Sequence, residues 1–448
     1  MLKKVKSSIL WLASWIVMPI SVVWLLCQLL RHLPKYRWAD HIFHDVFMGN
    51  FGNIINIHNS RRRHGGKNII TTCMYEPGST HNLKLGLIYP DVMVLMIRKT
   101  CLVFSIGKKK FRFPSDELIT PIKDAVSEWF MWVFAPQATF QNYGALMSRQ
   151  KVPPSLKGII SEEYMEKYAE TVMATIFSNI VWYGHFAKEY KDPSMPRPRL
   201  PEPLRREIHE KLKAARHGRE ARLCMSYNKF EEVADYVRQG SAIEDYLPAV
   251  RLLVAQGYQV LLAGDRSFDQ AQMDEFDGMV VDAGRVDVEK DLFRLFAPTE
   301  ADICIGDAGA GILIPLMVGI PILVLNYYPV GIGSAGTWVY PKRYVDEAGN
   351  TVPYQRAIKE DLYGIYEPDR EEPLRISPVC NSGEEITEAV ECFLEDVASP
   401  SDVAPGDELM DLVPKRSSLY FYGSKFSPAF IRRNRMISPG RHPGKCPK

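Results

Sequence analysis

A glycine-rich turn near residue 309 has the residue types and spacing of a phosphate-binding site. Gly306, Gly309 and Gly311 fall between two apolar runs, Ile303–Ile305 and Ile322–Leu325, that are typical of buried parallel strands. Glycines let the backbone approach a ligand closely, and the helix expected to follow offers unpaired N–H groups and a positive dipole end. The pattern predicts either a phosphate site or an ordinary strand-to-helix turn without a ligand.

Further polar residues follow the ends of neighbouring predicted strands, Arg222–Tyr227, Tyr258–Ala263 and Met279–Asp282. Helical segments alternate with these strands, which predicts a parallel doubly wound sheet whose ligands bind at the carboxyl ends of the strands. The residues expected to meet at that edge are Tyr227, Gly264, Asp265, Arg266, Asp282, Gly306, Asp307, Ala308 and Gly309.

Four charged or titratable side chains have a specific expected role. Arg238 and Arg266 are candidates for a diphosphate clamp, because a guanidinium can bind two phosphate oxygens at once; the alternative is solvated surface arginines. We expect Asp307 to cap the following helix or to contact a sugar hydroxyl, since a carboxylate aimed at phosphate would repel it. His81 is the candidate general base, against a purely structural histidine.

Several classes of protein are excluded by absent patterns. The chain has no GxxxxGK[ST] loop, no GxSxG elbow and no HExxH motif, and GDAGAG lacks the acidic partner of a dinucleotide site. No exposed Asp-x-Asp is evident, and the eight cysteines form no CxxC pair, so neither a metal nor a cofactor is expected. A net charge of +2 argues against nucleic-acid binding, and cysteines in apolar runs indicate reduced thiols.

Ile9–Leu30 is almost entirely apolar. At about 1.5 Å per residue such a run just spans the roughly 30 Å hydrocarbon core of a bilayer. No signal-peptidase site follows it, and basic residues flank it. Pro19 and the tryptophans equally suit a helix lying in the membrane interface, and the remaining alternative is a buried core helix. The basic termini fit attraction to an anionic cytoplasmic leaflet.

A chain of 448 residues suggests two substantial domains with appendages. The expected parts are a hydrophobic anchor with basic flanks (1–37), an N-terminal α/β domain (38–191), a proline-rich linker (192–203), a C-terminal α/β domain (204–400) and a C-terminal segment with a basic tail (401–448). Strands are expected at Asn68–Thr72, Val92–Ile97 and Leu102–Ile106, and a charged surface helix at Leu204–Arg216.

The second domain resembles the nucleotide-sugar-binding domain of two-domain GT-B glycosyltransferases, and in particular a family of bacterial surface-glycan glycosyltransferases. The resemblance covers mainly Leu223–Ile358. It lies in the order and spacing of short motifs: Tyr236-Val237-Arg238, Ile243–Ala249, Gly257–Val260 with Gly264-Asp265, Asp282, the glycine-rich turn with Gly319-Ile320-Pro321 and Asn326, and Tyr340-Pro341-Lys342-Arg343-Tyr344. Ser79–Asn82 adds a weaker match.

This resemblance implies a GT-B-like fold of two Rossmann-like, doubly wound domains facing a cleft. It adds Gly311, Asn326 and Lys342 to the donor-binding residues. The implied activity is metal-independent sugar transfer from a nucleotide-sugar to a cell-surface glycan or lipid-linked acceptor, in polysaccharide biosynthesis at the cytoplasmic side of a bacterial inner membrane.

The chain departs from the family where Met225-Ser226-Tyr227 replaces a His-x-Arg-like triplet, Asp307-Ala308-Gly309 replaces a Ser-Gly pair, and Ala263 replaces an arginine. Two alternatives therefore stay open. One is a nucleotide-sugar epimerase of related fold, and the other is a catalytically inactive membrane scaffold.

Overall fold

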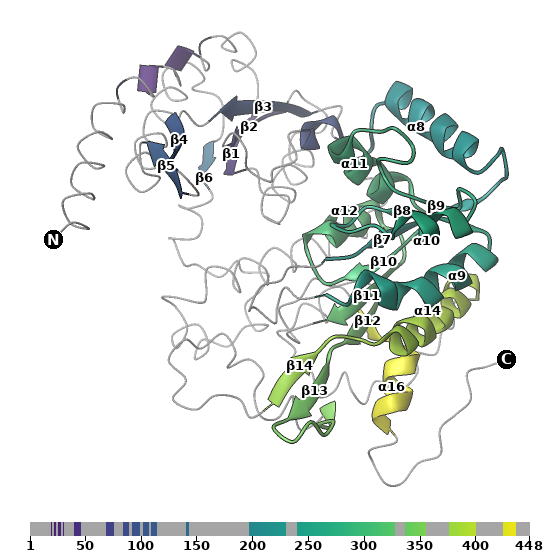
Figure 1. Cartoon of the computed structure of the whole chain (residues 1–448). Coiled ribbons are helices and arrows are strands. Elements are labelled where there is room, and N and C mark those ends of the chain that lie inside the picture. The colour runs from purple at the N-terminus through teal and green to yellow at the C-terminus, as the bar shows by residue number, and fades with distance from the viewer. Residues whose placement is uncertain are drawn as a thin grey trace. The chain divides into compact units, whose positions relative to one another are not determined.

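The structure is a computed structural model of the chain, and it describes part of the 448 residues. The described residues are isolated helical positions between 19 and 30, the segments 40–45, 69–75, 84–88, 92–98, 102–106, 109–113 and 140–142, and the longer stretches 197–229, 240–327, 337–354, 376–399 and 424–435. The chain divides into two compact units, Met1–Gln150 and Lys151–Lys448 (Figure 1). Each unit is described by itself.

The first unit contains a parallel sheet with the strand order β3-β2-β1-β6. Its strands are β1 (Asp40–Asp45), β2 (Ile69–Tyr75), β3 (Val92–Arg98) and β6 (Phe140–Asn142), and the short turn η1 (Leu85–Ile88) lies between β2 and β3 in sequence. A separate antiparallel pair joins β4 (Leu102–Ile106) to β5 (Lys109–Phe113). The three strands predicted for this region are confirmed, whereas β1, β5 and β6 were not predicted.

The second unit contains a seven-stranded parallel sheet with the order β15-β12-β11-β10-β7-β8-β9. Its strands are β7 (Arg222–Tyr227), β8 (Tyr258–Leu262), β9 (Val280–Val281), β10 (Ile303–Asp307), β11 (Ile322–Tyr327), β12 (Trp338–Pro341) and β15 (Lys425–Phe426). Between β12 and β15 in the sequence, β13 (Arg343–Asp346) and β14 (Ile376–Val379) form a separate antiparallel pair.

Helices connect these strands. They are α8 (Glu202–Ala215), η3 (Ile243–Tyr246), α9 (Leu247–Ala255), α10 (Gln270–Glu275), α11 (Lys290–Glu300), η4 (Ala310–Ile312), α12 (Leu313–Val318), α14 (Gly383–Ala398) and α16 (Pro428–Arg435). α9 packs on α14, and α11 packs on α12. Figure 1 shows these two pairs on opposite faces of the sheet, which confirms the doubly wound prediction for this unit.

Burial on both faces explains why the central strands are so apolar. Every residue of β8, β10 and β11 is buried, and their sequences are near-continuous runs of aliphatic residues. Cys224 and Cys304 lie in this core as small apolar side chains, and burial raises the pKa of both thiols. The bounds of these central strands were therefore predictable to within about two residues from the apolar runs in the sequence.

The strand order places the topological switch point between β7 and β10. Along the chain, β8 and β9 are added in order on one side of β7, and β10 then pairs with the other side of β7. The parallel register pairs Tyr227, the last residue of β7, with Gly306 near the end of β10. In open α/β sheets this is the position at which ligands bind, beyond the carboxyl ends of the strands.

The charged helix was predicted almost correctly. α8 begins at Glu202, inside the predicted linker, because Pro203 lies in the first helical turn, where a missing N–H loses no hydrogen bond. Ile208 and Leu212 are buried. Arg205 forks onto Glu300 of α11, with Nε–Oε1 and Nη2–Oε2 distances of 2.6 and 2.7 Å, so α8 belongs to the second unit.

The expected anchor, Ile9–Leu30, lies mostly outside the described residues. Its described positions are helical, and Val23 and Leu30 are among the exposed large apolar side chains. Among the residues that the structure describes, no helix has the length and apolarity needed to cross a membrane.

Candidate functional site

Tyr227 and the glycine-rich turn meet at the switch point. A Cβ at Gly311 would lie 2.5 Å from Tyr227 Cζ, and one at Gly306 would lie 2.8 Å from Tyr227 Cβ. The Tyr227 ring therefore requires a glycine at 311, and the backbone and Cβ of Tyr227 require one at 306, so both glycines are explained without a ligand. Burial raises the pKa of the Tyr227 hydroxyl, so it stays protonated at neutral pH.

Lys229 lies against the same turn and was not predicted. A Cβ at Gly309 would lie 3.5 Å from Lys229 Cδ and 3.4 Å from Tyr227 Cε1. The half-buried lysine thus passes beside Gly309, where an added Cβ would meet Tyr227 less closely than at Gly306 or Gly311. A cation beside an accessible glycine backbone is a suitable arrangement for binding phosphate.

The turns after β8 and β9 extend this edge. Asp265 donates its N–H to Asn228 O at 2.9 Å, which ties the turn after β8 to the one after β7. Arg294 Nη2 lies 2.9 Å from both Gly264 O and Asp265 Oδ1. Arg266 is exposed.

Asp282 has local partners in the same region. It accepts a hydrogen bond from Ser267 Oγ at 2.5 Å and another from the Arg285 N–H at 3.0 Å. We call Tyr227, Lys229, Gly264, Asp265 and Gly309, with these neighbouring turns, the switch-point rim.

Asp307 does not cap the following helix, so that prediction is wrong. α12 has Ile312 at its N-cap and no side-chain cap hydrogen bond. The Asp307 carboxylate instead accepts hydrogen bonds from Tyr246 Oη at 2.7 Å, Asn326 Nδ2 at 2.5 Å and the Lys229 N–H at 2.8 Å. Its side chain is held between three segments and is 2% exposed.

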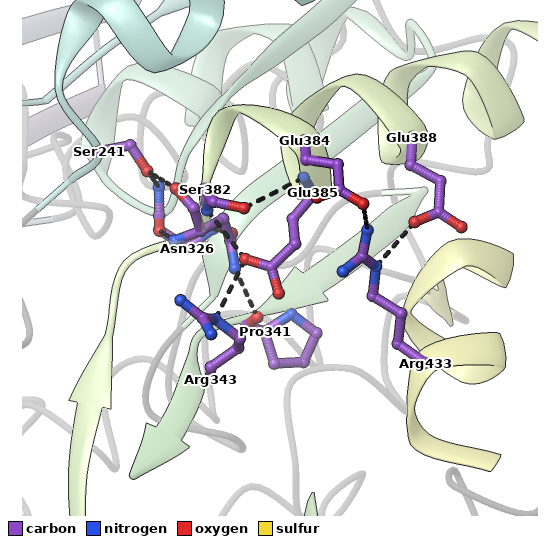
Figure 2. A network of polar contacts seen from close by, with 10 residues as sticks. Ser241, Asn326, Pro341, Arg343, Ser382, Glu384, Glu385, Glu388 and Arg433 are labelled. Carbon is purple, nitrogen blue, oxygen red and sulfur yellow. Dashed lines mark hydrogen bonds and ion pairs between the residues drawn. The ribbon is translucent and has the colours of Figure 1, made fainter. Parts of the chain in front are cut away.

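Asn326 and Asn381 complete this cluster. Each asparagine accepts the backbone N–H of the other through its Oδ1 atom at 2.7 Å, so two side-chain amides replace strand pairing between β11 and the segment before α14. Asn326 has a φ of 50°, which asparagine tolerates, and the register between β11 and β12 shifts there. Ser241 links both asparagines, accepting from Asn326 Nδ2 at 2.9 Å and donating to Asn381 O at 2.7 Å (Figure 2).

We call Ser241, Tyr246, Asp307, Asn326 and Asn381 the buried network. Burial is the main influence on the pKa of Asp307 and raises it to about 6, against the lowering effect of its hydrogen bonds and of the Lys342 charge. The Tyr246 hydroxyl, buried beside Asp307, also has a raised pKa. Lys342 is 1% exposed. A carboxylate held in this way locks strands together and is not directed at a substrate.

The predicted residues thus divide into three groups. The switch-point rim and its adjoining turns contain Tyr227, Gly264, Asp265, Arg266, Asp282, Gly306, Ala308, Gly309 and Gly311. Asp307, Asn326 and the nearby Lys342 belong to or adjoin the buried network. His81 and Arg238 lie outside the described residues. In the part of the chain that is described, no three His, Cys, Asp or Glu side chains form a group able to hold a metal ion.

Four residues of these two clusters were missed by sequence reasoning: Lys229, Ser241, Tyr246 and Asn381. Lys229 follows a predicted strand by two positions, which is the one local signal that could have identified it. Tyr246 falls within a predicted helix and resembles an ordinary core aromatic residue. Asn381 lies 55 residues beyond its partner Asn326, and no local pattern connects them.

Comparisons with known proteins give distant structural similarity alone. No family model and no curated protein matches the chain. A glycosyl transferase family 9 protein from Veillonella parvula DSM 2008 superposes with a TM-score of 0.38 at 13% identity, over 80% of this chain and 98% of that protein. The E. coli ADP-heptose lps heptosyltransferase II gives 0.31 at 9% identity, over 64% and 84%.

The wall teichoic acid polymerase TagF is a third structural neighbour. It gives a TM-score of 0.27 at 11% identity, over 89% of this chain and 98% of that one. At such low scores these similarities carry no argument about this chain, and no residue roles are transferred from them.

Proposed function

We propose that this protein is a metal-independent glycosyltransferase that binds a nucleotide-sugar at the switch-point rim. The observation that carries the proposal is the coincidence of three features at one position. The strand order reverses between β7 and β10, a glycine-rich turn ends β10, and the Lys229 side chain lies against the accessible glycine of that turn.

In this proposal the donor diphosphate lies beside Gly309 rather than over Gly311. The Tyr227 ring fills the space at Gly311, and its protonated hydroxyl is a donor rather than a negative charge. Lys229, together with Arg266 on the neighbouring turn, would neutralise the charge that develops on the leaving nucleoside diphosphate. Lysine and arginine at these positions provide the electrostatic stabilisation that a metal ion provides in other transferases.

The acceptor hydroxyl needs a base other than Asp307. Asp307 is fully enclosed by its own hydrogen-bond donors and has no path to a substrate. His81 remains our proposed base, because the sequence before it, Pro77-Gly78-Ser79-Thr80, predicts a turn and imidazole titrates near neutral pH.

Membrane association completes the proposal. The apolar run Ile9–Leu30, with Val23 and Leu30 exposed on its helix, supports attachment of the enzyme to the cytoplasmic face of a membrane. A lipid-linked or cell-surface glycan precursor would then be the acceptor. No cofactor beyond the nucleotide-sugar is proposed.

The test is calorimetric titration of the full chain with UDP, ADP, GDP and CDP, followed by nucleotide-release assays with the matching sugar nucleotides. At least one nucleotide should bind, and Lys229→Ala should weaken it roughly 10–100-fold, because a hydrogen bond to a charged group contributes about 1.5–3 kcal/mol. Lys213→Ala, on the exposed face of α8, is the matched control and should leave the affinity unchanged. Absence of binding by every nucleotide would overturn the proposal.

A further inference from the structure

A cavity of about 240 Å³ lies in the second unit, between the end of β12, the start of β13, α14 and α16. Its walls include Tyr340, Arg343, Tyr344, Tyr354, Phe430 and Arg433. Lys342 is the one predicted donor-binding residue that also lines it, and none of the residues that define the switch-point rim does.

Aromatic rings form one wall of this cavity. Phe430 of α16 packs edge-to-face against Tyr340 and Tyr354, with ring centroids 5.3 and 5.0 Å apart. Tyr344 lies 6.3 Å from Tyr354. Rings that pack against one another in this way form a rigid apolar surface, which is the usual lining of small-molecule sites.

Two arginines line the cavity, and carboxylates of α14 hold both. Arg433 uses Nε and Nη2 to bind Glu388 and Glu384, each at 2.8 Å. Arg343 Nε lies 3.2 Å from Glu385 Oε2. Figure 2 shows both guanidinium groups on the same side of α14. The Nη1 atom of Arg433 and the two Nη atoms of Arg343 have no partner among the described residues, so three fixed donor groups remain for a ligand.

The Tyr340 hydroxyl is the second sign of a ligand. Tyr340 is 1% exposed, yet its oxygen has no hydrogen-bond partner among the described residues. A buried hydroxyl without a partner destabilises a fold by roughly 1–3 kcal/mol, and such groups are rare in native proteins. Burial is the main cause that raises the pKa of this hydroxyl, and the charges of Glu385, Arg433, Glu388 and Arg343 also act on it, so these charged groups lie near it.

Glu385 does not make this a cation site. Its Oε2 atom accepts the Ser382 N–H at 2.9 Å in the capping box of α14 and also faces Arg343. The carboxylate is therefore already compensated, whereas the guanidinium groups and the tyrosine hydroxyl have donors to spare. A ligand with acceptor oxygens matches that surplus.

We infer that this cavity is a second ligand site, separate from the switch-point rim, that takes a small molecule carrying a phosphate or carboxylate group on an apolar or aromatic body. Arg343, Arg433 and Tyr340 bind the oxyanion, and Phe430 with the tyrosine rings contacts the body. An apolar cavity of about 150 Å³ is enough to hold benzene, so this volume accommodates a ring with an oxyanion attached.

The test titrates the full chain with phenyl phosphate, benzoate, inorganic phosphate and phenol by calorimetry. Phenyl phosphate or benzoate should bind at least about tenfold more tightly than either inorganic phosphate or phenol, since each of those lacks one half of the ligand. A preference between the two aryl anions identifies the oxyanion. Arg343→Ala should weaken binding roughly 10–100-fold.

Tyr340→Phe separates a binding role from a structural one. It should weaken binding about five- to tenfold while leaving the melting temperature unchanged or higher, because the hydroxyl that it removes has no described partner. Arg251→Ala on the exposed face of α9 is the control and should change neither. Lys229→Ala should leave phenyl phosphate binding intact, which separates this site from the nucleotide site. Failure of all four probes to saturate, or binding insensitive to both pocket substitutions, would overturn the inference.

Discussion

The switch-point rim and the buried network lie at the ends of adjacent strands, yet they treat polar residues in opposite ways. At the rim, Lys229, Asp265 and Arg266 are exposed or half-buried. In the network, Asp307 and Asn326 are each 2% exposed and bind one another. On β10 the two environments meet at neighbouring residues. Gly306 contacts Tyr227, whereas the side chain of Asp307 points into the network.

A polar residue at the carboxyl end of a parallel strand therefore has two distinct uses. It can remain accessible and bind a ligand, or it can lock neighbouring segments in place beneath the ligand site. Only the partners decide which, and they come from distant parts of the chain. Substitutions in the network should therefore affect stability, and substitutions at the rim should affect ligand binding.

The largest effect is expected for Asp307→Ala. The substitution removes the acceptor for Tyr246 Oη, Asn326 Nδ2 and the Lys229 N–H, and it removes a negative charge that interacts with Lys342. We expect a loss of about 3–5 kcal/mol in the free energy of unfolding, measured by urea denaturation. Asp282→Ala, at the rim, should lose less than about 1 kcal/mol. Equal losses in the two variants would erase the distinction between the regions.

The same carboxylate should make stability depend on pH. The pKa of Asp307 rises from about 3.8 in the unfolded chain to about 6 in the fold, so the folded state holds the extra proton between those values. Its contribution is complete below pH 3.8 and is lost as the pH rises through 6, by up to about 3 kcal/mol at 1.36 kcal/mol per pKa unit.

Asp307→Asn isolates this contribution. The stability difference between wild type and this variant, measured by urea denaturation, should shrink as the pH rises from 4 to 7. Asp274→Asn is a control of opposite sign, because a hydrogen bond from Arg285 lowers the pKa of Asp274 and its contribution grows with pH. A difference that stays constant for Asp307→Asn would show that the network carries no titrating group.

Gly311→Ala tests whether the Tyr227 ring fills the space at Gly311. The added Cβ would lie 2.5 Å from Tyr227 Cζ, and overpacking of this kind destabilises a protein by about 1–3 kcal/mol. Tyr227→Ala should remove that penalty, so in a double-mutant cycle the alanine at 311 becomes nearly neutral in the second background. Additive losses would mean that the ring and the turn do not meet.

The strands β7 to β11 were predictable because their burial requires near-continuous apolar runs such as Ile322–Leu325, whereas β12 to β15 were not predicted. The rim was predictable for a related reason, since the carboxyl ends of parallel strands converge once the alternation of strands and helices is recognised. Gly306 and Gly311 were also identified, although as part of a phosphate-binding turn rather than as the glycines against which Tyr227 packs.

The network could not be predicted in the same way. Its bonds join Asn326 to Asn381 and Tyr246 to Asp307, across 55 and 61 residues, and no periodicity records such pairings. An aspartate after a strand looks the same in sequence whether it caps a helix, contacts a ligand or holds a tyrosine. The distinction appears only when burial and partners are known.

Asp265→Ala should give the smallest change in stability, as expected for an accessible side chain at the rim. Its ion pair with Arg294 has an N–O distance of 2.9 Å, but the Asp265 side chain is 43% exposed, so solvent screens the pair. We expect a loss below about 1 kcal/mol in the free energy of unfolding.

If the rim binds a nucleotide-sugar, the same variant should lower the kcat/KM of the nucleotide-release assay roughly tenfold, the equivalent of one lost hydrogen bond to a charged group. Arg206→Ala, on the exposed face of α8, serves as the control because it breaks another exposed ion pair, the one with Glu202. A large loss of stability with unchanged kcat/KM would show that Asp265 stabilises the fold and does not bind the ligand. The turn after β8 would then not belong to the accessible rim.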